Sequence, residues 1–151
     1  MMNKVLCSLL LFLSISCGLQ GRNANYARDS KRIWLDSKEI HHGEYVWKMK
    51  KAGDVISSAE KVSTLGYDTS DWLSAIVPGT VLNSLVYNKE YPEPYYGVNN
   101  KLESGKIPDI SKVGREFYTY WFRTEFDVPE SFAGKTIWLQ PDGVNYRAEI
   151  W

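Results

Sequence analysis

The stretch FYTYWFRTEFDVP at residues 117–129 constrains the fold most, because apolar and polar side chains alternate along it. Successive side chains of an extended strand point to opposite faces, so this alternation indicates a β-strand with two distinct faces. One face carries four aromatic rings, and the other combines an indole with charged groups that we expect to be solvated and partly paired. The two sets are Tyr118, Tyr120, Phe122 and Phe126, and Trp121, Arg123, Glu125 and Asp127.

Shorter alternating segments accompany this strand and are separated by turns. Residues 44–52, 135–140 and 145–151 alternate in the same way, and Pro- and Gly-containing stretches lie between them. Thr80 is placed to cap one short helix. Little other helix is indicated, so we predict an all-β, antiparallel β-sandwich. The side chains that we expect in its core are Trp121, Phe122, Phe126, Ile137, Leu139 and Ile150. The pattern does not decide whether Trp138 and Trp151 point to the core or to solvent.

The N-terminal segment has the pattern of a secretory signal peptide. Lys4 supplies a positive charge, residues 5–15 are mostly apolar, and no further charge occurs in the segment. The apolar run is shorter than the ~20 residues that a membrane-spanning helix needs, although a short membrane anchor is the alternative. We therefore predict a signal peptide at residues 1–21, a leader with a first short strand at 22–43, and the domain at 44–151.

Cys17 lies in the stretch LSISCG, which resembles the cleavage site of a bacterial lipoprotein. In such a protein this cysteine is lipidated, and one lipidated cysteine tethers a chain to a membrane without spanning it. Ser14 stands where leucine is more usual, so ordinary cleavage nearby is the alternative. We expect an exported chain that is periplasmic or anchored to the outer membrane of a bacterium. The only two cysteines of the sequence, Cys7 and Cys17, both lie in this N-terminal segment, so we expect no disulfide within the domain.

The charge balance and the residue pattern argue against several classes of function. Lys and Arg total 18, as do Asp and Glu, so no basic surface for nucleic acid is indicated. His41 and His42 are adjacent and would point to opposite faces of a strand, which does not favour a metal or catalytic site. The GKT stretch at 134–136 lacks the preceding glycine of a phosphate-binding loop, because Pro129 stands there. We predict no metal, no cofactor and no catalytic residue in this sequence.

Four motifs resemble the N-terminal sugar-binding domain of glycoside hydrolase family 2: VPGTVL, YPEPYYGVNN, REFYTYWFRTEFDVP and DGVNYRAEIW. They are most similar to the branch of β-mannosidases, exo-β-glucosaminidases and mannosylglycoprotein endo-β-mannosidases. The resemblance implies a galactose-binding-like jelly-roll β-sandwich, followed by an immunoglobulin-like domain and a (β/α)₈ barrel. Two glutamates of that barrel would catalyse retaining hydrolysis. Both would lie beyond Trp151, so we expect no glycosidase activity from this chain alone. Because the sequence stops at Trp151 within an apolar strand, we also expect a truncated sandwich.

The resemblance also implies a role for the tyrosine-rich loop. In relatives this loop packs toward the barrel, and in some of them an asparagine touches the substrate sugar. The corresponding residues here are Tyr95, Tyr96, Asn99 and Asn100. Tyrosine rings pack on the CH face of a sugar, and an amide both donates to and accepts from hydroxyls. Packing against the neighbouring domain without any sugar contact is the alternative.

The resemblance therefore implies a non-catalytic, sugar-binding or packing domain of a retaining, β-mannosidase-like glycosidase, which the predicted signal peptide indicates is secreted. Its expected partner is an oligosaccharide or glycan, which the barrel of the parent enzyme would bind. A free-standing carbohydrate-binding module and a structural domain of a surface protein are the alternatives.

Overall fold

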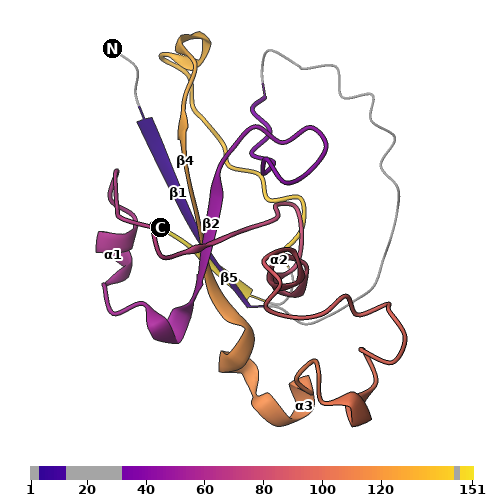
Figure 1. Cartoon of the computed structure of the whole chain (residues 1–151). Coiled ribbons are helices and arrows are strands. Elements are labelled where there is room, and N and C mark those ends of the chain that lie inside the picture. Colours follow the sequence, from indigo (N-terminus) through magenta and orange to yellow (C-terminus); the bar gives the residue numbers. More distant parts are fainter. Residues whose placement is uncertain (1–3, 13–31, 145–146) are drawn as a thin grey trace.

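The computed structural model describes residues 4–12, 32–144 and 147–151 of the chain (Figure 1). The strands are β1 (Lys4–Phe12), β2 (Trp47–Lys51), β3 (Leu73–Ser74), β4 (Thr119–Asp127) and β5 (Arg147–Ile150). The α-helices are α1 (Ala59–Val62), α2 (Val81–Tyr87) and α3 (Ile110–Val113). Short 3₁₀ helices occupy Ala52–Asp54, Leu102–Ser104, Arg115–Tyr118 and Glu130–Phe132.

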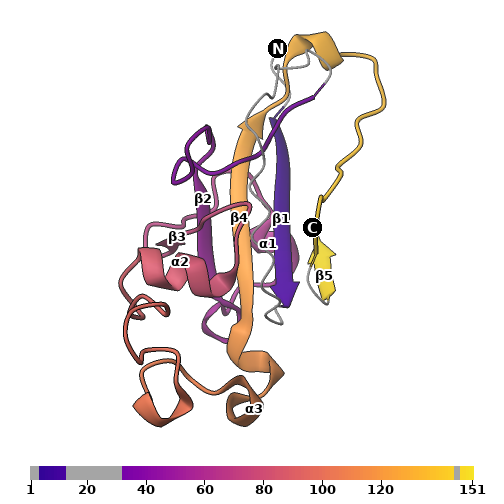
Figure 2. The ribbon, with the colours of Figure 1, turned by 90° about the vertical axis from the view of Figure 1, so that its right-hand side faces the viewer.

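The strands form one five-stranded sheet in the order β3-β2-β4-β1-β5. Each neighbouring pair is antiparallel, and β4 is central (Figure 2). β2 lies along one side of β4, so that Met49 is opposite Phe122. The antiparallel sheet and the short helices confirm the prediction of an all-β fold.

The larger hydrophobic cluster lies between one face of the sheet and α2. It contains the aromatic face of β4, as the alternation predicts, and the alternate apolar residues of β2. Val81 and Leu85 of α2 complete the contact. The buried members are Trp47, Met49, Ala75, Val81, Leu85, Tyr118, Tyr120 and Phe122. Full burial of such side chains contributes roughly 1.5–3 kcal/mol each, so this cluster is the main source of stability.

Helix α2 begins where the sequence predicts. The Thr80 side chain accepts a hydrogen bond from the Asn83 amide at 3.0 Å, which satisfies one of the free N–H groups of the first turn. At the other end, the Asn88 amide donates to the Ser74 carbonyl at 2.8 Å and accepts from the Ser74 N–H at 3.3 Å. Asn88 therefore ties the end of α2 to the outer strand β3.

A second hydrophobic cluster covers the opposite face of the sheet. Val62 of α1, Trp72 and Trp121 are its buried members, and Tyr67 packs against them. Trp121 lies on this face because it precedes Phe122 in β4 and therefore points the other way. Arg123 also lies here but is only 5 % exposed. The expectation that this charged face is solvated is thus wrong for Arg123, because residues 62–64 cover its guanidinium.

The predicted strand at 135–140 is not present, because this segment has no hydrogen-bonded neighbouring strand within the described residues. Ile137 and Leu139 are exposed, and so is Ile150 on the terminal strand β5, whose partner is β1. The prediction that these three side chains join the core is therefore wrong. The two tryptophans whose orientation the sequence did not decide are also exposed: Trp138 is 84 % exposed and Trp151 is 43 % exposed. Alternation reports extended backbone, but burial also requires a covering layer.

The N-terminal apolar run contributes β1, which pairs with β4 on one side and β5 on the other. The sequence predicts a signal peptide at residues 1–21, and its cleavage stays a prediction. Cys17, the predicted lipidation site, lies outside the described residues. The first short strand predicted within residues 22–43 is reduced to a single bridge between Ser37 and Tyr45.

The phenol of Tyr120 should make stability depend on alkaline pH. Burial, followed by the nearby Tyr91 and Tyr118, raises its pKa to about 12. An unfolded tyrosine titrates near pH ~10, so the folded state holds this proton more tightly. The contribution of the protonated Tyr120 phenol to the free energy of unfolding is complete below pH ~10 and is lost as the pH rises toward 12.

We therefore expect the free energy of unfolding, measured in urea, to fall less steeply over that interval in Tyr120→Phe than in the unchanged protein. Tyr91 and Tyr118 titrate in both proteins, so the difference isolates Tyr120. Equal slopes would contradict the assignment.

Candidate functional site

The four tyrosines between residues 87 and 96 lie in different environments. Tyr91 packs against the larger hydrophobic cluster, and burial raises its pKa. Tyr87 at the end of α2 is 53 % exposed, and Tyr95 and Tyr96 are each 76 % exposed. Tyr91 therefore anchors the loop to the core, while Tyr95 and Tyr96 present their rings at the surface.

The loop from Glu93 to Lys101 is a series of tight turns. Backbone N–H groups of Tyr96 and Asn99 donate to carbonyls three residues earlier, at 3.2 Å in each case. Gly97, within the second of these turns, has a φ of +58°, in the left-handed region that favours glycine. The turns place Tyr95, Tyr96 and Asn100 at the surface.

Asn99 differs from the other predicted site residues, because it is only 5 % exposed. Its amide nitrogen donates to the Glu93 carbonyl at 2.8 Å, and its amide oxygen accepts from the Lys106 ammonium at 3.0 Å. The Ser104 hydroxyl donates to the Asn99 backbone carbonyl at 3.1 Å. Asn99 therefore holds the two ends of the loop together, and its predicted contact with a sugar stays a prediction.

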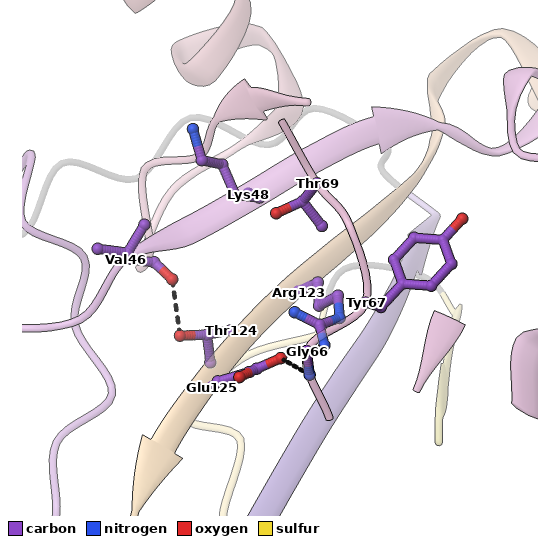
Figure 3. A pocket seen from close by; sticks show the side chains of 8 residues that line it. All are labelled: Val46, Lys48, Gly66, Tyr67, Thr69, Arg123, Thr124 and Glu125. Atoms are coloured by element: carbon purple, nitrogen blue, oxygen red, sulfur yellow. Dashed lines mark hydrogen bonds and ion pairs between the residues drawn. The ribbon is translucent and has the colours of Figure 1, made fainter. Parts of the chain in front are cut away.

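A separate cavity of about 300 Å³ lies on the face of the sheet that carries Arg123 (Figure 3). Its walls come from the start of β2, the C-terminal half of β4, and the segment that connects α1 to β3. The lining residues are Val46, Lys48, Gly66, Tyr67, Thr69, Arg123, Thr124 and Glu125. This volume is at the lower end of the ~300–1,000 Å³ range of ligand pockets.

Arg123 organises this cavity through its guanidinium. Nε donates to the Val62 carbonyl at 3.0 Å, and a terminal nitrogen donates to the Thr64 carbonyl at 2.7 Å. The same nitrogen forms an ion pair with the Glu125 carboxylate. Glu125 in turn accepts from the Gly66 backbone N–H at 2.7 Å (Figure 3). One buried cation therefore fixes the connecting segment against β4.

The sequence does not reveal this cavity, because the wall from β4 lies more than fifty residues along the chain from the other two walls. The alternation in the sequence placed Arg123 on a solvated face. One signal was available: Arg123 lies two residues from Trp121 within a strand of aromatic residues. A buried charge at such a position needs hydrogen-bond acceptors from another segment.

The described residues show no arrangement typical of a metal site, since no group of three or more His, Cys, Asp or Glu side chains comes together there. His41 and His42 stack on each other with ring centroids 4.4 Å apart. No helix in the described part of the chain is long and apolar enough to cross a membrane.

The chain is similar to known proteins that are named as β-mannosidases and β-glucosaminidases. A mannosylglycoprotein endo-β-mannosidase of Lilium longiflorum is 41 % identical over 83 residues, which is 55 % of this chain and 8 % of the lily protein. An exo-β-D-glucosaminidase of Streptomyces avermitilis is 28 % identical over 106 residues, 70 % of this chain and 10 % of that protein. The exo-β-D-glucosaminidase of Amycolatopsis orientalis is 26 % identical over 96 residues, 64 % of this chain and 8 % of that protein.

The chain thus spans about a tenth of the length of these relatives. No solved structure matches it. Residues 47–151, from β2 to the last residue given, match the family described as the glycosyl hydrolase 2 galactose-binding domain-like family. The match covers more than half of the chain and confirms the predicted family, and the relatives named above belong to the predicted branch. This chain therefore belongs to the glycosyl hydrolase 2 galactose-binding domain-like family.

Proposed function

We propose that this chain is the N-terminal, non-catalytic carbohydrate-binding or packing domain of an exported retaining β-glycosidase that acts on glycans. The observation that carries the proposal is the family match, which includes the loop and β4. The two groups of relatives are named for action on β-mannosides and β-glucosaminides, which supports a β-linked substrate. Catalysis belongs to glutamates elsewhere in the parent protein, the N-terminal segment directs export, and Cys17 is the residue that is lipidated.

The loop contributes to this function through its exposed rings. Tyr95 and Tyr96 present apolar ring faces on which the CH groups of a sugar can pack, and the exposed Asn100 amide can pair with hydroxyls. Asn99 and Tyr91 hold the loop in place from the inside. In the parent enzyme this surface faces the substrate or the neighbouring domain.

The test is a titration of the ¹⁵N-labelled chain with methyl β-D-mannoside, followed by NMR. We expect saturable shifts of the Tyr96 and Asn100 amides. Asn100→Ala should weaken binding roughly three- to ten-fold, because one hydrogen bond to a neutral hydroxyl contributes about 0.5–1.5 kcal/mol. Tyr87→Ala, at an exposed tyrosine outside the loop, is the matched control and should leave the affinity unchanged.

A nitrophenyl β-mannoside assay completes the test. We expect no release of nitrophenol above the buffer blank, since the catalytic glutamates lie elsewhere. Release that scales with the concentration of this chain would refute the non-catalytic assignment. Unshifted loop amides throughout the mannoside titration would refute the sugar contact and leave packing as the role of the loop.

A further inference from the structure

We propose that Asp142 is a site of spontaneous covalent modification, at which the chain converts aspartate to isoaspartate through a cyclic succinimide. Asp142 is followed by Gly143, and this Asp-Gly pair occurs once in the sequence. Both residues are exposed, and they lie in a described segment, 133–144, that has no helix or strand. Figure 2 shows the chain that leads to β5 as an extended segment beside the sheet. The pair is therefore open to solvent.

The reaction needs only these two residues and water. The backbone nitrogen of Gly143 attacks the side-chain carbonyl carbon of the protonated Asp142 carboxyl, and the carboxyl hydroxyl leaves as water with the amide proton. The product is a five-membered succinimide. Water then opens this ring at one of its two carbonyls. Opening at the former side-chain carbonyl restores aspartate, whereas opening at the former peptide carbonyl gives isoaspartate, whose backbone is one carbon longer on the way to β5.

The surroundings of Gly143 leave its nitrogen free to attack. Its N–H donates no hydrogen bond to any described residue. A Cβ built at Gly143 meets no atom within 4 Å, so the space around this backbone is open. Glycine also has the least restricted backbone and carries no side chain that would hinder the approach of the nitrogen to the Asp142 carboxyl.

Three other aspartates are followed by a backbone N–H that is already bonded. The Ser37 N–H, directly after Asp36, donates to the Val77 carbonyl at 2.7 Å, and Ser37 is fully buried. This nitrogen must give up its hydrogen bond before it can attack the preceding carboxyl. The same holds after Asp54 and Asp71, where the N–H groups of Val55 and Trp72 donate to the carbonyls of Ala52 at 3.2 Å and Thr69 at 3.0 Å.

The remaining described aspartates are followed by residues that are branched at Cβ. A branched side chain crowds the backbone and restricts its rotation, so it hinders closure of the ring. The three pairs are Asp68-Thr69, Asp109-Ile110 and Asp127-Val128. Asp142 is therefore the described aspartate at which the following residue is both unhindered and free of a backbone hydrogen bond.

The experiment incubates the full chain at neutral pH and physiological temperature, with samples taken over several weeks. Trypsin releases residues 136–147, a peptide in which Asp142 is the one aspartate. We expect a second form of this peptide with the same mass but a different chromatographic retention, and a minor form lighter by one water. The unchanged mass separates this product from deamidation of Asn145. Protein isoaspartyl methyltransferase should transfer a labelled methyl group to the second form.

Two variants test the assignment of the reacting atoms. Gly143→Ala should remove most of the methylated product, and alanine fits the open space at this position, so the circular dichroism spectrum should stay unchanged. Asp142→Glu keeps the charge and should also remove the product, because its ring would have six members and closes less readily. Gly53→Ala is the matched control: it changes another open glycine, which does not follow an aspartate, and should leave the yield unchanged.

A synthetic peptide of residues 136–147 measures the rate without the fold. If Asp142 of the folded chain does not convert over the period in which the peptide does, the fold protects this site and the proposal is wrong. An unchanged yield in Gly143→Ala would exclude attack by that nitrogen. Equal conversion at Asp36 in the folded chain would contradict the selectivity, whereas in urea Asp36 should begin to convert, because the Ser37 N–H loses its bond to Val77.

Discussion

Replacing Arg123 with methionine should lower the free energy of unfolding by about 3 kcal/mol. The guanidinium is buried and binds two backbone carbonyls and the Glu125 carboxylate. Methionine fills part of the space but donates no hydrogen bond, so the carbonyls of Val62 and Thr64 lose their donor. Loss of this link should also release the segment around Gly66 from β4.

The chain contains a matched control for this substitution. Arg147 pairs with Glu149, also two residues further along a strand, but their side chains are 66 % and 45 % exposed. Exposed ion pairs contribute little, so Arg147→Met should change the free energy of unfolding by less than about 0.5 kcal/mol. Urea unfolding of both variants, followed by tryptophan fluorescence, gives the comparison. Similar midpoints for the two variants would show that Arg123 does not hold the segment.

Gly43→Ala should destabilise the chain by about 1–3 kcal/mol or more, because no space exists for a methyl group. A Cβ at this position would lie 1.2 Å from the carbonyl oxygen of Ser37. The turn cannot easily move away, because the Lys38 N–H donates to the Tyr45 carbonyl at 3.0 Å and the Ser37 N–H donates to the Val77 carbonyl at 2.7 Å. Relief of the clash must therefore break contacts on one side of the turn.

Gly53→Ala is the control for Gly43→Ala. A Cβ at Gly53 meets no atom within 4 Å, and its φ is not in the left-handed region. Alanine there should be neutral or slightly stabilising, since it reduces the freedom of the unfolded chain. Thermal unfolding monitored by circular dichroism measures both changes. A Gly43→Ala protein that melts at the temperature of the Gly53→Ala protein would contradict the close approach.

Patterns that depend on neighbouring residues could be predicted from the sequence. The two faces of β4, the alternation in β2 and the cap at Thr80 all follow from short-range periodicity and the chemistry of one side chain. The family also followed from local motifs. These features require no knowledge of what packs against the segment.

Features that depend on distant contacts could not be predicted. Asn99 and Asn100 are adjacent and chemically identical, yet only Asn99 is buried, because Glu93 and Lys106 converge on it. Ile137 has the alternation of a core strand but no covering layer, so it is exposed. The burial of Arg123 depends on carbonyls about sixty residues earlier in the chain.

Trp121 and Phe122 are consecutive residues, and each lies in a different hydrophobic cluster on its own side of the sheet. A change that loosens either cluster therefore acts on the same short piece of backbone. The two hydrophobic clusters cannot open independently, because both pack against β4. When one cluster separates from β4, the strand loses packing on that face and no longer holds its position for the other cluster. This shared strand should make unfolding of the two layers cooperative, with the amides of Trp121 and Phe122 exchanging with solvent only when the whole sheet opens.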